Sequence, residues 1–135
     1  MVSIRTEYLG DLHCTILHEP SGTTLNTDAP ADNHGKATSF SPTDLVASAL
    51  GSCILTVMGL KAKALKLDMV GATATVEKQM TTVPVRRISR MDVTVRVPQQ
   101  IALDDRFRQE EAAHTCPVHK SMHPDIEMAI AFHWE

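Results

Sequence analysis

The chain has little of what a nucleic-acid surface or a disulfide scaffold requires. Aromatic residues make up 4% of its 135 residues, and 13 basic against 16 acidic residues leave a formal charge of −3. Nucleic-acid binding needs a basic patch with stacking rings, so the composition argues against that partner. Three cysteines are too few for a disulfide framework. No repeat or Gly/Ser linker divides the sequence, which predicts one domain over residues 1–135.

The sequence also shows no targeting segment. Its first residues alternate and carry charge, instead of forming a basic segment followed by an apolar core, so no secretory signal is visible. No apolar run reaches the roughly 18 to 20 residues that span a bilayer. We therefore expect a cytoplasmic protein with no membrane partner. Cytosolic thiols are kept reduced, so any disulfide here is expected to be catalytic or sensing.

The order of the predicted elements indicates an α+β domain. Alternating apolar and β-branched residues predict strands at 2–8, 13–19, 23–27, 72–80, 88–98 and 126–134. A polar loop from Asp28 to Ser39 precedes a helix that runs to about Lys66, and a second helix is predicted from Leu103 to His114. The order βββ-α-ββ-α-β implies mainly antiparallel sheet.

The first helix has a clear start signal and an apolar body. Ser41 as N-cap, Pro42 at the first helical position and Asp44 in the first turn come close to a capping box. From Leu45 to Leu60 the helix is apolar nearly all round, which predicts that it is buried on most sides.

The cysteines lie in unlike settings. Cys53 lies within the apolar helix, where a small core hydrophobe is the plain interpretation. Cys116 precedes a proline, which disfavours helical backbone at the cysteine and places its thiol just past the second helix. Cys14 alternates onto the same strand face as Ile16 and is expected to pack.

Two motifs around the cysteines resemble a known family. The stretch F-S-P-T-D-L-V-A-S-A-L-G-S-C, followed about sixty residues later by C-P-V-H-K-S-M, is similar to the OsmC/Ohr family of small thiol proteins. The predicted element order agrees over essentially the whole chain. The resemblance implies an intertwined homodimer in which one long helix per subunit crosses the centre. Such packing would explain a helix that is apolar all round.

The resemblance also implies a chemistry. In the peroxidatic branches, the position of Cys53 attacks an organic hydroperoxide and becomes a sulfenic acid, and the position of Cys116 resolves it as a disulfide. A resolving thiol stops oxidation before the irreversible sulfinic stage, and a dithiol reductant then restores both thiols. The expected function is a thiol-dependent peroxidase in oxidative-stress defence, with Cys53 and Cys116 as its catalytic residues.

The chain departs from the peroxidatic pattern at two positions. Those branches have a glutamate after the helix-start proline and an arginine in the first hairpin, whereas here Thr43 follows Pro42 and the first turn reads Y-L-G-D-L-H. A free cysteine is only a few per cent thiolate at neutral pH, and the helix dipole fades within the first turn, about three turns before Cys53. A cation from elsewhere is therefore expected.

Several residues are candidates for this supporting role. The candidate cations are Arg5, His13, Arg86, Arg87 and His119, and the sequence does not choose among them. Asp44 is a candidate for orienting one of them. The predicted supporting residues are Thr43, Asp44 and His119. The chain is more similar to the less defined OsmC-like branch. An alternative stays open, in which a non-peroxidatic dimer binds a small apolar or electrophilic ligand at its interface.

Histidines near Cys116 raise the question of a metal. His114, Cys116, His119 and His123 are ligand types that suit zinc or copper. Their spacing matches no closed structural site, so we expect no metal. No Gly-rich phosphate loop, Ser/His/Asp signature or helical H-E-x-x-H motif is present, and we expect no cofactor.

Overall fold

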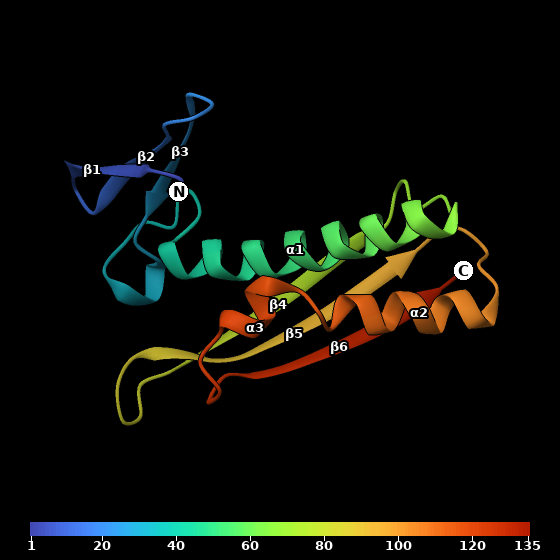
Figure 1. The fold of residues 1–135 in the computed structure, drawn as a ribbon. Coiled ribbons are helices and arrows are strands. Elements are labelled where there is room, and N and C mark those ends of the chain that lie inside the picture. Colours follow the sequence, from blue (N-terminus) through green and yellow to red (C-terminus); the bar gives the residue numbers. More distant parts are fainter. The chain divides into compact units, whose positions relative to one another are not determined.

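A computed structural model describes all residues, 1–135, and they cluster into two compact units, Met1–Val46 and Ala47–Glu135. The strands are β1 (Ile4–Gly10), β2 (His13–His18), β3 (Thr23–Asp28), β4 (Thr73–Thr81), β5 (Arg87–Val97) and β6 (Glu127–Trp134). The helices are the short 3-10 helix η1 (Ala31–Asn33) and the α-helices α1 (Pro42–Leu65), α2 (Leu103–Ala113) and α3 (Pro117–Ser121). Figure 1 shows these elements, which confirm the predicted α+β class.

The first unit is built on an antiparallel sheet of β1, β2 and β3. None of its hydrophobic side chains is buried, and its buried residues are the polar Thr27, Asp28 and Ser41. A three-stranded sheet needs an apolar face packed against something to be stable on its own. Residues 1–46 therefore depend on surroundings beyond their own sheet.

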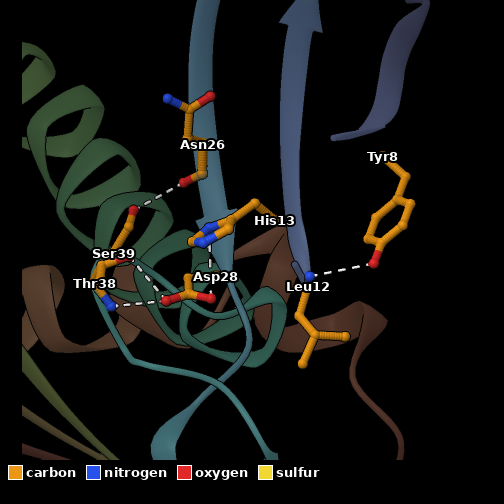
Figure 2. Close-up of polar contacts among 7 residues, drawn as sticks. All are labelled: Tyr8, Leu12, His13, Asn26, Asp28, Thr38 and Ser39. Carbon is orange, nitrogen blue, oxygen red and sulfur yellow. Dashed lines mark hydrogen bonds and ion pairs between the residues drawn. The ribbon is translucent and has the colours of Figure 1, made fainter. Parts of the chain in front are cut away.

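Hydrogen bonds to the end of β3 close the loop between β3 and α1. The Oδ2 of Asp28 accepts hydrogen bonds from the N–H and the hydroxyl of Thr38, at 2.9 and 2.8 Å. The N–H of Asp28 donates to the carbonyl of Phe40, and the hydroxyl of Ser39 donates to the carbonyl of Asn26. Figure 2 shows the side-chain contacts of this closure. Asp28 therefore anchors a segment that the sequence identifies only as a polar loop.

The second unit contains a sheet in the order β4-β5-β6. β4 and β5 form the predicted hairpin, whereas β5 and β6 pair in parallel. The expectation of mainly antiparallel sheet therefore holds with this one exception. The return through α2 and α3 carries the chain back to the end of the sheet where β5 starts.

Alternation places the apolar side chains of this sheet on one face. In β5 the buried members are Met91, Val93, Val95 and Val97. α1 and α2 run along this sheet (Figure 1). A Cβ on Gly51 of α1 would lie 3.1 Å from Val76 of β4, so the absent side chain permits the close approach of helix and strand.

α1 buries one stripe and not most of its circumference. Its buried residues are Ala47, Leu50, Gly51, Ile54, Met58 and Ala62, which recur at helical spacing. The expectation of burial on most sides is wrong for this chain taken alone, because Ser52, Thr56 and Leu60 are exposed.

α1 also corrects the expectation about apolar runs. By length and composition alone this helix is long and apolar enough to cross a bilayer, and 33% of an apolar 18-residue window in it is buried. The serines and threonines in this helix are uncharged and lower the mean hydropathy only slightly. Core helices of folded domains can be equally long and apolar, so this property carries no conclusion about a membrane.

Candidate functional site

Cys53 lies on α1 at the edge of the buried stripe. It neighbours the fully buried Ile54 and is itself half-buried, with a free thiol. Its sulfur is thus held on a rigid helix, between the packed core and the exposed residues Ser52 and Thr56. A thiol in such a position is accessible to a small reactant from one side.

Cys116 lies between α2 and α3, in a short segment fixed by backbone hydrogen bonds. The N–H groups of Thr115 and Cys116 donate to the carbonyls of Ala112 and Ala113, at 2.9 and 3.4 Å. Cys116 has a non-helical backbone, with φ −50° and ψ 121°, and N-caps α3, as its sulfur accepts a hydrogen bond from the N–H of His119 at 3.4 Å. Its side chain is fully buried. The prediction that the thiol lies just past the second helix is confirmed, whereas the five-residue α3 was not predicted.

The structure brings the two predicted cysteines into contact. Burial raises the pKa of the Cys116 thiol, a hydrogen bond with the Cys53 side chain raises it further, and the bond from the N–H of His119 only partly offsets these effects. Cys116 therefore holds its proton at neutral pH. The catalytic roles of both cysteines remain predictions.

His119 contributes its backbone and not a charge. Burial lowers the pKa of its imidazole, and the charges of Lys120 and His114 lower it further. The ring packs edge to face with that of His114, with centroids 6.3 Å apart. A neutral ring supplies no positive charge to a thiolate, so His119 is a poor candidate for the missing cation.

Thr43 and Asp44 take part in the start of α1. The N–H of Ser41 donates to Oδ2 of Asp44 at 2.9 Å, and the N–H of Asp44 donates to the hydroxyl of Ser41 at 3.1 Å. This reciprocal pair is the capping box that the sequence predicts. The hydroxyl of Thr43 lies 3.1 Å from that of Ser41. The role of Thr43 and Asp44 in supporting Cys53 stays a prediction.

The other candidate cations lie in different environments. Arg87 donates from Nη1 to the carbonyl of Ile88 at 3.1 Å, and Arg5 lies in the exposed strand β1. Arg86 lies just before β5. The described contacts do not identify which of these three arginines, if any, acts on Cys53. No group of three or more His, Cys, Asp or Glu side chains is arranged to hold a metal ion.

His13 is paired with a buried carboxylate, a partner that sequence reasoning missed. Its Nδ1 lies 3.5 Å from Oδ1 of Asp28, an oxygen that accepts no hydrogen bond (Figure 2). The two residues face each other across β2 and β3. Asp28 is 1% exposed, and hydrogen bonds from Thr38 hold the pKa of its carboxyl below the ordinary 3.8.

The ionised Asp28 is expected to keep the loop closed. Because its pKa is lowered on folding, its contribution is present above the unfolded pKa and is lost as the pH falls through the lower folded value. The variant Asp28→Asn removes the charge at every pH, so trypsin is expected to cut after Lys36 about tenfold faster at pH 8. Asn26→Ala is the control, because Ser39 uses only the backbone carbonyl of Asn26. Equal cleavage of Asp28→Asn and wild type would contradict this role.

Comparison with known proteins identifies the family of the chain. A model of the OsmC-like protein family matches residues 34–131. A solved structure from Psychrobacter arcticus, a proposed osmotic stress induced and detoxification response protein, is 41% identical with a TM-score of 0.93, covering 98% of this chain and 96% of that chain. A comparison with curated proteins gives no match.

More distant solved structures share the fold. An organic hydroperoxide resistance protein OsmC from Legionella pneumophila is 12% identical with a TM-score of 0.79, covering 98% of this chain and 96% of that chain. An OsmC-like protein from Mycoplasma pneumoniae is 14% identical with a TM-score of 0.83, covering 99% and 96%. At these identities the likeness concerns the fold alone.

Proposed function

Because the chain belongs to the OsmC-like protein family, we propose that it is a thiol-dependent peroxidase that reduces organic hydroperoxides in oxidative-stress defence. Fold relatives that are named organic hydroperoxide resistance proteins support the substrate class. The observation that carries the proposal is the contact between a half-buried Cys53 and a buried, protonated Cys116.

The proposed reaction has two steps before recycling. The thiolate of Cys53 attacks a peroxide oxygen, so that an S–O bond forms, the O–O bond breaks and the alkoxide leaves as an alcohol after taking a proton. The thiol of Cys116 then attacks the sulfenic acid of Cys53, so that an S–S bond forms and the hydroxyl leaves as water with the proton of Cys116. A dithiol reductant returns both sulfurs to thiols by exchange.

Disulfide formation tests the proposal directly. Reduced protein treated with one equivalent of cumene hydroperoxide is expected to lose two free thiols within seconds, and mass spectrometry should find the bond between Cys53 and Cys116. Cys14 is the internal control, because it lies on β2 and is expected to stay free. Persistence of both thiols under these conditions would contradict the proposal.

We further propose that the working form is a cytosolic homodimer. The first unit buries no hydrophobic side chain, and two thirds of the apolar window of α1 is unburied in one chain. A second copy of the chain would remove this apolar surface from water. Light scattering at micromolar concentration is expected to give twice the mass of 14.8 kDa, and a monomer would contradict the proposal.

A second candidate function is binding of a small apolar or electrophilic ligand without turnover. A groove of about 610 Å³ lies between α1 and α2. Its apolar lining includes Val57, Leu60 and Ala64 of α1 and Ala112 of α2, and it is also lined by Lys61, Arg108, Glu111 and Thr115. Its volume is in the range of ligand pockets. The cumene hydroperoxide experiment separates the two candidates, because binding alone leaves both thiols reduced.

A further inference from the structure

Gln109 is the one polar side chain that is fully buried in the second unit. It lies on α2, is 0% exposed, and faces α1. Burial of a carboxamide is costly unless its donor and its acceptor are both paired. Its partners therefore show what holds the two helices together at this point.

Both partners of Gln109 are backbone groups of α1. In the amide orientation that satisfies both, Nε2 donates to the carbonyl of Met58 at 2.9 Å and Oε1 accepts from the N–H of Ala62 at 3.0 Å. The carbonyl of residue i and the N–H of residue i+4 are each other's partners in a regular α-helix. The Gln109 amide thus binds from the side to a carbonyl and an N–H of α1 that are partners in a regular helix.

This contact links the segments that carry the two thiols. Met58 lies five residues after Cys53 on the same helix, and Gln109 lies seven residues before Cys116. No flexible loop intervenes, since backbone hydrogen bonds continue from the end of α2 through Thr115 into Cys116. The position of α2 along α1 therefore sets the position of one sulfur relative to the other.

We propose that Gln109 is a positioning residue for disulfide formation, whose amide fixes the register of α2 on α1 and so holds Cys116 against Cys53. The inference rests on the proposed function only for the use of the disulfide in turnover. The closeness of the two thiols does not depend on that function, and it can be measured without a peroxide. Two thiols held within disulfide reach have a high effective concentration, which falls steeply when they are misplaced.

The experiment measures that effective concentration by equilibrating the full chain with glutathione buffers and quantifying the disulfide between Cys53 and Cys116. In Gln109→Leu the apolar side chain keeps the volume, and the carbonyl of Met58 and the N–H of Ala62 pair with each other. We expect the effective concentration to fall about tenfold or more relative to wild type. The bond from Trp134 Nε1 to Glu110, at 2.9 Å, still ties α2 to β6, so the variant is expected to fold.

Gln109→Glu provides a reversible form of the same change. A neutral carboxylic acid donates one hydrogen bond and accepts another, as the amide does, whereas a carboxylate only accepts and opposes the carbonyl of Met58. Burial raises the pKa of a carboxyl group. We expect an effective concentration within about threefold of wild type at pH 6 and a loss of about tenfold or more at pH 9, each relative to wild type at the same pH.

Val93→Ala is the control for stability. It removes buried volume from β5 and so lowers stability as core truncations do, but a valine side chain makes no hydrogen bond to the backbone of α1 or α2. Its thiol equilibrium is expected to match wild type. An unchanged equilibrium in Gln109→Leu, an equal fall in Val93→Ala, or no pH dependence in Gln109→Glu would each overturn the proposal. If only the peroxide reaction fails while the glutathione results hold, the positioning role stands and the proposed function falls.

Discussion

Cys53→Ser is expected to reduce the consumption of cumene hydroperoxide by about a thousandfold or more, to the level of the uncatalysed reaction with the reductant. A serine hydroxyl keeps the shape of the side chain but has neither the acidity nor the polarizable lone pairs with which a thiolate opens an O–O bond. Because the side chain is only half-buried, the fold should tolerate the change. Peroxide loss under steady state, with a dithiol reductant in excess, measures the effect.

The comparison variant Cys116→Ser separates the two sulfurs. It should allow one rapid turnover and then stop, because the sulfenic acid of Cys53 has no resolving thiol. Mass spectrometry is expected to find Cys53 at the sulfinic stage after excess peroxide. Cys14→Ser should behave as wild type. Peroxide consumption that survives in Cys53→Ser would assign the reaction to another group.

Gly35→Ala is expected to cost about 3 kcal/mol of unfolding free energy. A Cβ on Gly35 would lie 1.7 Å from the carbonyl oxygen and 2.1 Å from the carbonyl carbon of Ala29, which is backbone and cannot rotate away. Gly35 also donates its N–H to the carbonyl of Pro30 at 3.0 Å. The added methyl group therefore forces the loop apart and separates Thr38 from Asp28.

Lys36→Ala is the matched control for that change. It introduces the same residue at the next, exposed position and should alter stability by less than about 0.5 kcal/mol. Urea unfolding followed by circular dichroism measures both variants, and hydrogen exchange at the Thr38 amide shows whether the loop opens. A Gly35→Ala variant as stable as Lys36→Ala would mean that the loop moves at little cost.

Most helix and strand boundaries can be predicted from the sequence, because they depend on local patterns of residues. The capping residues Ser41 and Asp44 marked the start of α1, and strict alternation marked β5 with its buried Val93 and Val95. α3 was missed because five residues are too few to show a period. The parallel pairing of β6 was missed because alternation looks the same in either strand direction.

For the candidate site too, some features follow from the sequence and others only from the tertiary structure. The order of residues was sufficient for choosing Cys53 and Cys116, since both lie in motifs that are read along the chain. Their contact, the raised pKa of Cys116 and the neutral ring of His119 required the tertiary structure, because desolvation and proton sharing depend on neighbours distant in sequence. Gln109 gave no signal on a helix rich in charge, because a buried amide and an exposed one look alike in sequence. Local patterns thus determine which elements form and predict which two thiols to examine, whereas non-local packing decides how those thiols meet.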